Sequence, residues 1–418
     1  MVKLAPGVPL DLALAFAPDA RVPVGQLAWA NNTAQLEWSR EVIARQLRVD
    51  GAIRYPQERG LVAARSREFD GLHGFLSDSL PEGWGRLVMS RRLAKLGVDI
   101  ATLTPVEHLA LVGEGGRGAL VFAPATTPEA DATSGIDLDA LAEEAGKILS
   151  GEDGELADIL AKAAGGSGGA RPKVHVGFGP KGEISIGGGE LPPDHASWIV
   201  KFKAPNDPTD IGPLEEAYAC MAEAAGLKLA EHRLIPAKKG PAYFATRRFD
   251  RPSPGARLHM LSLAGAVEAP TTPAALDYDQ FLRATHAITR NAQDVAHAFR
   301  RMIFNVLAHN RDDHARQHAY LMDNNGEWEL SPAYDLTYSP GPGGQHYLDI
   351  EGEGDKPTHK DIETLGAKHG LSKKEVGAMV EEVGVAVADW RKYAKEAGVT
   401  AATTKDVADA HARVRTTF

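Results

Sequence analysis

Residues 309–317 concentrate the residue types that carry chemistry. The stretch reads HNRDDHARQ, and four residues separate Asp312 from Gln317. A protein-kinase catalytic loop separates its catalytic Asp from a Mg²⁺-binding Asn in the same way. The spacing therefore predicts that Asp312 accepts the proton of an attacking hydroxyl. It also predicts that the amide oxygen of Gln317 binds Mg²⁺, although Gln is one methylene longer than Asn.

A further carboxylate follows a predicted β-hairpin. Residues 318–330 read HAYLMDNNGEWEL and alternate in polarity on both sides of an Asn-Asn-Gly turn. The chain then reaches Asp335 in the sequence SPAYDL, where a kinase keeps its second metal-binding carboxylate. Asp335 is thus a candidate Mg²⁺ ligand. The simpler alternative, in which Asp312 and Asp335 only cap turns, stays open.

The same stretch has a second chemical interpretation. His and Asp side chains are metal ligands in many hydrolases, and Asp313 and His314 could combine with His309 and His318. Such a site would need donors that converge from other parts of the chain. No other histidine-rich segment is evident in the sequence, so this alternative is the less favoured one.

A lysine and a glycine-rich loop precede these carboxylates. Lys201 ends the apolar segment SWIVK, and a strand lysine can reach nucleotide phosphates. Glu215 or Glu216, at the start of the next predicted helix, could pair with it. Residues 165–173 read GGSGGARPK, and their backbone N–H groups could hold phosphates. The loop lacks the Walker pattern and could equally be a linker.

The segment ATRRFDR ends a predicted strand before the helical part of the chain. In a kinase with two lobes, the backbone here would contact adenine, and Phe249 could pack on the base. The alternative for Phe249 is an ordinary core position. Asp250 and Arg251 could form a plain surface ion pair.

The pattern of elements predicts an order of lobes. Residues 21–125 read as a mixed unit, with a strand in VPVGQLAW, a helix over 39–51 and a basic helix over 74–97. After a small, polar segment and a helix over 138–149 come short strands in KVHVGF, GEISIG, SWIVKFK, EHRLIPA and AYFATRRFDR, interrupted by a helix over 214–227. From about residue 257 helical spacing dominates. We therefore expect an α+β chain in which a strand-rich lobe precedes a helix-rich lobe.

Composition limits the class of protein. A single cysteine, Cys220, excludes an internal disulfide framework and a zinc cluster built from cysteines. The first residues lack the pattern of a signal peptide, and no apolar run is long enough to span a membrane. We therefore expect a cytoplasmic protein. The net charge of −10 argues against broad non-specific binding to nucleic acid.

Taken in order, these segments resemble the HipA family of serine/threonine kinase toxins from bacterial toxin–antitoxin systems. The resemblance covers about residues 21–390 and rests on LPEGWGR, GRGALVF, GGARPKVHV, WIVKF, RRFDR, RLHM, FRRMIFNVLAHNRDDH and LSPAYDL. It implies a bilobal protein-kinase-like fold, distantly similar to phosphoinositide kinases. The implied parts are an N-terminal subdomain over 1–125, a linker and kinase N-lobe over 126–249, and a helical C-lobe over 250–418.

The resemblance also assigns roles to residues. It implies Asp312 as the catalytic base and Asp335 as the metal-binding carboxylate, with Gln317 where members commonly have Asn. Lys201 falls on the ATP lysine, and the backbone of Arg247 and Phe249 falls on the adenine-binding hinge. The loop residues Gly168, Gly169 and Ala170 are expected to contact ATP.

Family members can be silenced by autophosphorylation of a serine in this loop. The expected position holds Gly166, and Ser167 is one residue later, so Ser167 is a candidate regulatory site. The family's partner is a small helix-turn-helix antitoxin, HipB-like, that binds operator DNA. An acidic toxin would then contact nucleic acid only through that partner. Known substrates in the family include aminoacyl-tRNA synthetases.

Three functions follow as expectations. The first is an ATP- and Mg²⁺-dependent protein serine/threonine kinase that acts as a toxin. The second is a nucleotide-binding pseudokinase that acts as a co-repressor with a DNA-binding antitoxin, an alternative that Gln317 keeps open. The third is a kinase of a small molecule, which would use the same carboxylates.

Overall fold

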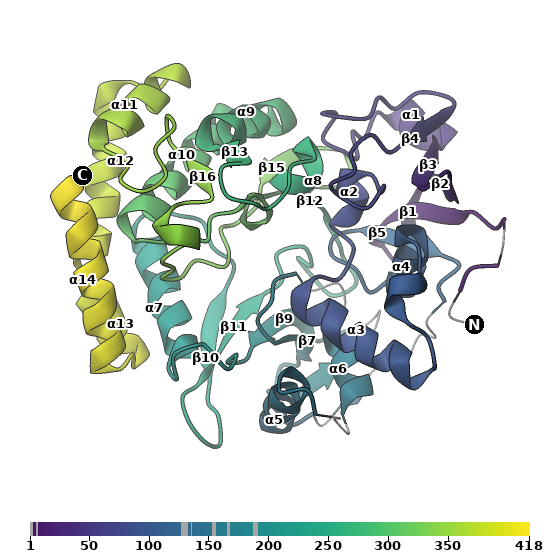
Figure 1. The fold of residues 1–418 in the computed structure, drawn as a ribbon, viewed down its shortest axis with the longest axis horizontal. Helices are drawn as coiled ribbons and strands as arrows, with labels where there is room; N and C mark the ends of the chain where they lie inside the picture. The colour runs from purple at the N-terminus through teal and green to yellow at the C-terminus, as the bar shows by residue number, and fades with distance from the viewer. Residues whose placement is uncertain are drawn as a thin grey trace.

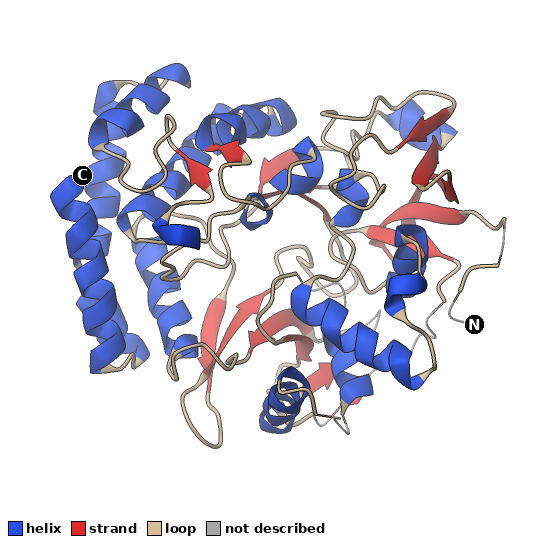
Figure 2. Cartoon of the chain, in the orientation of Figure 1, coloured by secondary structure: helices blue, strands red, loops and turns tan. Residues whose placement is uncertain are grey.

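The computed structural model describes residues 3–5, 7–126, 133–134, 136–152, 156–164, 168–186 and 191–418. The predicted regulatory residue Ser167 lies outside these residues, as does much of the predicted linker after residue 126. Three regions surround the centre of the molecule in Figure 1: an N-terminal unit, a sheet lobe and a helical lobe. Figure 2 shows strands accompanied by helices in the first two regions and mostly helices in the third.

The N-terminal unit is built on an antiparallel sheet with the strand order β4-β3-β2-β1-β5. Its strands are β1 Leu10–Ala17, β2 Ala20–Ala30, β3 Thr33–Trp38, β4 Leu61–Ala63 and β5 Leu120–Ala123. Its helices are α1 Arg40–Arg45, α2 Gly74–Ser77, α3 Gly83–Lys95, the 3₁₀ turn η1 Ile100–Thr102 and α4 Pro105–Val112. The predicted strand in VPVGQLAW and the predicted basic helix are both present, the latter as α2 and α3.

Two elements of this unit differ from the sequence-based expectation. The helix predicted over residues 39–51 ends after Arg45, because Gln46 adopts a left-handed conformation with φ of 52°. Strand β1 was not predicted, although it alternates apolar residues and lies inside the sheet between β2 and β5. Its partner β5 is about a hundred residues away in the sequence, so this pairing forms only when the whole unit folds.

The sheet lobe is a second antiparallel sheet, ordered β10-β11-β9-β7-β8-β6. Its strands are β6 Thr133–Ser134, β7 Lys173–Phe178, β8 Ile184–Ile186, β9 Ala196–Lys201, β10 His232–Ile235 and β11 Tyr243–Arg247. Helices α5 Leu138–Leu149 and α6 Ala157–Ala164 share a core with β7 and β9, and α7 Ile211–Ala224 packs on β10 and β11. All five strands predicted for this lobe are present.

The helical lobe contains a small three-stranded sheet and most of the long helices. Its first elements are β12 His259–Ser262, α8 Leu263–Val267, β13 Leu276–Asp277, α9 Tyr278–Thr289 and α10 Ala292–Leu307. They are followed by η2 Ala315–Gln317, β14 Ala319–Met322, β15 Trp328–Leu330, η3 Pro342–Gly344, β16 Leu348–Asp349, α11 His359–Lys368, α12 Lys373–Ala388, α13 Trp390–Ala397 and α14 Ala401–Thr417. Strands β14 and β15 form the predicted hairpin, and Gly326 supplies the positive φ of 86° in its turn.

Hydrophobic packing joins the N-terminal unit to the helical lobe. One core cluster contains Leu10 and Phe122 from the first sheet together with Phe299 and Phe304 from α10. The sheet lobe has a separate cluster, which includes Trp84 of α3. Helix α7 of the sheet lobe packs against α12 and α13 of the helical lobe, so both other regions contact the sheet lobe through defined elements, and the centre where they meet is the place to look for a site. None of the helices in the described part of the chain is long and apolar enough to span a bilayer.

Candidate active site

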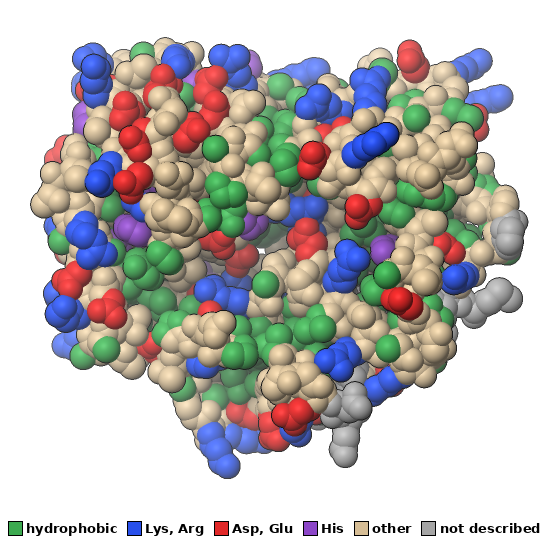
Figure 3. All heavy atoms as spheres, viewed as in Figure 1, with side chains coloured by type: hydrophobic (Ala, Val, Ile, Leu, Met, Phe, Trp, Pro, Cys, Tyr) green, Lys and Arg blue, Asp and Glu red, His purple; other side chains and the backbone are tan. Residues whose placement is uncertain are grey.

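A pocket lies where the sheet lobe meets the helical lobe. It encloses about 1180 Å³, part of it open to solvent. In the space-filling view, charged and histidine side chains gather around a hollow near the centre of the face (Figure 3). The lining residues that the sequence predicted are Gly168, Gly169, Lys201, Arg247, Phe249, Gln317 and Asp335. Ala170 and Asp312 do not line it.

Lys201 is the centre of the charged part of this pocket. Its Nζ lies 2.9 Å from Oε2 of Glu215 and also contacts Oδ1 of Asp335. Burial opposes the charge of Lys201, but the two carboxylates outweigh it and raise its pKa above the ordinary value. Burial likewise opposes the charge of Asp335, and Lys201 and Lys173 outweigh it, so the pKa of Asp335 lies well below its usual range. Three elements, β9, α7 and the segment after β15, thus meet at one ion-pair cluster.

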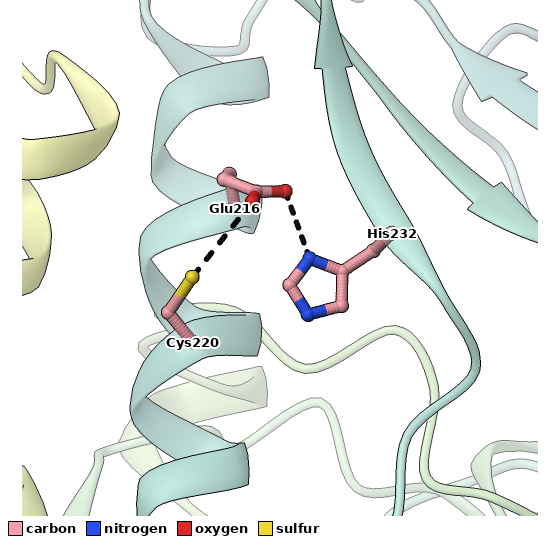
Figure 4. A group of neighbouring side chains, drawn as sticks. All are labelled: Glu216, Cys220 and His232. Carbon is pink, nitrogen blue, oxygen red and sulfur yellow. Dashed lines mark hydrogen bonds and ion pairs between the residues drawn. The ribbon is translucent and has the colours of Figure 1, made fainter.

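The structure also decides between the two consecutive glutamates of α7. Glu215 is buried and also forms an ion pair with a second cation: Nη1 of Arg171 lies 3.4 Å from Oε1 of Glu215. Glu216 points elsewhere and pairs with His232 of β10 and with Cys220 (Figure 4). Glu215 is therefore the partner of Lys201 that the sequence left unassigned.

Lys173 is a pocket residue that the sequence-based reasoning missed. It faces Lys201 directly in the register of β7 and β9, and its Nζ donates to the carbonyl of Gly168 at 2.6 Å. Burial lowers the pKa of Lys173, and the charge of Lys201 lowers it further. Like charges opposite each other in a sheet are normally unfavourable. Here the nearby charge of Asp335 partly offsets that repulsion. The only sequence signal was a lysine directly after the glycine-rich loop.

The glycine-rich loop rests on the N-terminal unit. The carbonyl of Gly169 accepts the N–H of Trp84 at 3.1 Å, and Nε1 of Trp84 donates to the carbonyl of Lys173 at 2.9 Å. A side chain at Gly83 would bring its Cβ to 2.5 Å from the Gly169 oxygen, so only glycine fits there. The LPEGWGR segment therefore holds the loop against the sheet lobe.

The two adjacent aspartates, Asp312 and Asp313, have different surroundings. Asp313 is fully buried; it accepts hydrogen bonds from the Tyr278 hydroxyl at 2.6 Å and the Tyr347 N–H at 2.8 Å, and Nδ1 of His346 lies 2.8 Å away. The side chain of Asp312 is 46% exposed, and Nε2 of His314 lies 3.9 Å from it. Partial burial and the charge of Asp335 raise the pKa of Asp312 above its ordinary value. Only Asp312 is free to meet a substrate.

The alternative metal site around this stretch is not assembled. His318 is buried with its ring 4.1 Å from that of Phe281, and Nδ1 of His309 lies 3.2 Å from the Ser339 carbonyl. Nδ1 of His314 accepts the N–H of Arg316 at 3.2 Å. Asp313 is saturated by other partners. In the part of the chain that the structure describes, the donors that do come together are those of Glu216, Cys220 and His232.

Gln317 lies in η2, and the N-terminal unit supports this turn. Nη1 of the preceding Arg316 lies 2.6 Å from Oε1 of Glu82 and 3.5 Å from Oδ1 of Asp78. The Tyr334 hydroxyl donates to the carbonyl of Arg316 at 2.6 Å. Glu82 itself lines the pocket. Nothing in the sequence indicated this long-range contact beyond the charge of the residues.

The predicted hinge lines the pocket, but one of its donors is in use. The N–H of Arg247 donates to the carbonyl of Glu231 at 2.7 Å within the sheet. The ring of Phe249 lies 5.5 Å from that of Tyr334, so it packs against the segment that leads to Asp335. A nucleotide base could not use the Arg247 N–H without displacing the sheet hydrogen bond.

Asp250 and Arg251 are not a plain surface pair. The charged ends of both side chains are buried. Oδ2 of Asp250 lies 2.8 Å from Nη1 of Arg251 and 2.7 Å from Nη2 of Arg248. The same oxygen accepts a hydrogen bond from the N–H of Gly118. Burial opposes the charge of Asp250, and the two arginines outweigh it, so its pKa lies well below the ordinary range. This buried ion-pair group joins the end of β11 to the N-terminal unit.

Comparison with solved structures supports the fold. The Shewanella oneidensis MR-1 HipA, solved as a toxin–antitoxin complex of HipA, HipB and operator DNA, superposes with a TM-score of 0.70. The sequences are 18% identical, and the match covers 97% of this chain and 95% of that one. The Helicobacter pylori proinflammatory kinase CtkA covers 58% of this chain and 94% of that one, at 14% identity and a TM-score of 0.34. A score this low supports no conclusion about fold or activity.

Comparison with protein families is more direct. No curated protein matches the sequence. The model of the HipA N-terminal domain matches residues 20–123, and the model of the HipA-like C-terminal domain matches residues 165–390. The second match alone covers more than half of the 418 residues. The predicted α+β, bilobal, kinase-like fold class is confirmed, and the chain belongs to the HipA family.

Proposed function

We propose that this protein is an ATP- and Mg²⁺-dependent protein serine/threonine kinase that acts as the toxin of a toxin–antitoxin pair. The observation that carries the proposal is the contact of Lys201 with both Glu215 and Asp335 inside the pocket between the lobes. A strand lysine, a helix glutamate and a metal-binding aspartate are the parts that a kinase must bring together.

The pocket suits ATP in shape and charge. One part of its wall is apolar and includes Ile199, Phe244 and Leu336, which suits the flat face of a purine. Another part presents the ammonium groups of Lys173 and Lys201 beside Gly168 and Gly169. These cations and the loop backbone would bind the phosphates. Arg247 and Phe249 would flank the base.

Asp335 and Gln317 suit Mg²⁺ because both offer oxygen atoms to the pocket, and Mg²⁺ prefers such ligands. When bound, the ion would offset the charge on the transferred phosphoryl group. Asp335 is ionised at neutral pH, since its pKa lies well below the usual range. Lys201 neutralises Asp335 when neither ligand is present, so ligand binding has to replace that ion pair.

Asp312 would orient the substrate hydroxyl and accept its proton. It is exposed enough to meet a protein side chain, and its raised pKa makes it a better proton acceptor than an ordinary aspartate. Ala170 lies outside the pocket lining, and its role would be limited to shaping the loop.

Phosphotransfer with γ-labelled ATP and Mg²⁺ tests this function. Wild-type protein should label a protein in a cell lysate, or itself, and mass spectrometry would identify the residue. Asp312→Asn and Asp335→Ala should lose the label, while Asp406→Asn, a change at an exposed position of α14, should keep it. Equal labelling by the wild type and Asp312→Asn would contradict the proposal. Label on a small molecule alone would favour a metabolite kinase.

A second candidate is a nucleotide-binding pseudokinase that acts as a co-repressor. Gln317 favours it, because the amide occupies the pocket with a side chain longer than the usual Asn. In this case ATP would bind tightly without turnover. Asp312→Asn would then keep full repression in cells.

The partners follow from the Shewanella complex, which contains HipB and operator DNA. We propose a HipB-like helix-turn-helix antitoxin as the partner, with nucleic acid contacted only through it. The net charge of −10 supports this division of roles. A protein substrate such as an aminoacyl-tRNA synthetase, autophosphorylation at Ser167 and a cytoplasmic location complete the proposal.

A further inference from the structure

A second cluster of polar side chains lies on α7 and β10; it makes none of the Lys201 ion pairs, although its His232 also lines the pocket. Glu216 and Cys220 are one helical turn apart, and His232 of β10 faces them (Figure 4). Oε1 of Glu216 lies 3.7 Å from the sulfur of Cys220, and Oε2 lies 3.0 Å from Nδ1 of His232. The kinase chemistry proposed above uses none of these three side chains.

The donor atoms and their spacing fit a tetrahedral metal ion. One carboxylate oxygen, one thiol sulfur and one imidazole nitrogen all lie within 4.8 Å of one another. Ligands bound to zinc at its usual bond lengths of about 2.0–2.3 Å lie roughly 3.3–3.8 Å apart. Small rotations of these side chains would therefore close the trio around one ion.

The other nitrogen of His232 provides an independent indication. Its Nε2 lies 3.5 Å from Oε2 of Glu223, one more turn along the same face of α7. Metal-binding histidines usually present their second nitrogen to a carboxylate, which fixes the ring and its tautomer. The imidazole is thus held in the orientation that directs Nδ1 at Glu216 and Cys220.

The local charge also favours a cation. The carboxylates of Glu216, Glu223 and Glu396 all act electrostatically on the Cys220 side chain. The side chains of Glu216 and His232 are mostly buried, and that of Glu223 is half-exposed. A divalent ion would neutralise negative charge that the hydrogen bonds of Glu216 to Cys220 and His232 do not offset.

We propose that Glu216, Cys220 and His232 form a binding site for a divalent transition-metal ion of the zinc class. Glu223 positions His232 from behind, and the fourth coordination position is open to water or another ligand. The ion joins α7 to β10. Its ligand Glu216 directly follows Glu215, which contacts Lys201. The rival interpretation is a hydrogen-bonded trio that joins the same two elements without metal.

Titration of the full-length, tag-free protein with Co²⁺ distinguishes these interpretations. The wild type should bind one equivalent and develop a thiolate-to-cobalt absorption band in the near ultraviolet, and Zn²⁺ should abolish it. Cys220→Ser keeps the Glu216–His232 pair, so it should fold normally but lose the band. Glu223→Gln should weaken Co²⁺ binding about tenfold. Absence of the band from the wild type would overturn the proposal.

Thermal unfolding with and without Zn²⁺ supplies a second readout. The ion should raise the melting temperature of the wild type and leave that of Cys220→Ser unchanged. An equal rise in both proteins would show that the ion binds elsewhere. Lys201→Met serves as a matched control, since it changes the proposed ATP site and should not alter the cobalt band. The two proposals can therefore fail independently.

Discussion

Two neighbouring regions near the candidate active site contain adjacent aspartates with opposite environments: the half-exposed loop at Asp312, here called the mouth, and the buried group of Asp313 with Tyr278, His346 and Tyr347, here called the platform. Asp312 at the mouth is half-exposed, while Asp313 in the platform is fully buried among Tyr278, His346 and Tyr347. The pKa of Asp312 is raised and that of Asp313 is lowered. Residue type therefore does not decide which carboxylate reacts. The partners of each carboxylate decide it, since a group saturated with hydrogen bonds has no position left for a substrate.

The largest expected effect is at the mouth. Asp312→Asn should lower the rate of phosphotransfer by about 10³-fold, because an amide cannot accept the hydroxyl proton. Binding of ATP should stay within a few-fold of the wild type, since Asp312 does not line the pocket. Initial rates and nucleotide titrations measure both quantities. A rate within tenfold of the wild type would assign the base elsewhere.

The platform should respond through stability instead. Asp313→Asn replaces a buried carboxylate that accepts from two protein donors and pairs with His346, and should lower the free energy of unfolding by about 3 kcal/mol. Urea denaturation measures this change. Asp406→Asn on the exposed surface is the matched control and should stay within about 0.5 kcal/mol of the wild type. An unchanged midpoint for Asp313→Asn would remove the distinction between platform and mouth.

Lowering the pH should reduce the stability contributed by Asp313, with a smaller effect than its substitution. Burial raises the pKa of Asp313, but His346 and the hydrogen bonds outweigh it and leave the pKa below its ordinary value. The unfolded chain then binds the proton more readily than the folded one, so this stabilisation is present above about pH 4 and is lost as pH falls through the folded pKa. The difference in stability between wild type and Asp313→Asn should shrink below about pH 4. A difference that grows with acid would contradict the assignment.

The smallest effect should come from Gln317, which lines the pocket. Gln317→Asn shortens the side chain by one methylene and should change the Mg²⁺ concentration needed for half-maximal phosphotransfer by only a few-fold. Stability should not change, because Gln317 donates to the protein through its backbone N–H, to the His314 carbonyl. Phosphotransfer that appears only in Gln317→Asn would instead support the pseudokinase.

Much of the fold could be predicted because it is encoded locally. Strand β2, the β14–β15 hairpin and helices α9 and α10 follow from alternating or helical apolar spacing and from turn residues. Strand β1 was missed although it alternates apolar residues and forms a local hairpin with β2; only its other partner, β5, is about a hundred residues away. The helix predicted over 39–51 was too long, because its apolar spacing continues past the left-handed residue Gln46 that ends it.

The candidate site could be predicted in part. Lys201, Gln317 and Asp335 were identified from residue type and spacing, and all three line one pocket. Lys173 was missed because its relation to Lys201 depends on strand register. The ion pair between Arg316 and Glu82 was missed as well, since it joins segments more than two hundred residues apart.

The sequence by itself determined the order of the elements and the candidate side chains for phosphotransfer. It could not decide between Glu215 and Glu216, or establish that Asp313 is saturated while Asp312 is free. Those distinctions depend on burial and on partners brought from distant segments, and both arise only when the chain packs. Charge and hydrogen bonding act over a few ångströms, so the chemistry of each carboxylate is settled by its neighbours in space rather than by its neighbours in the sequence.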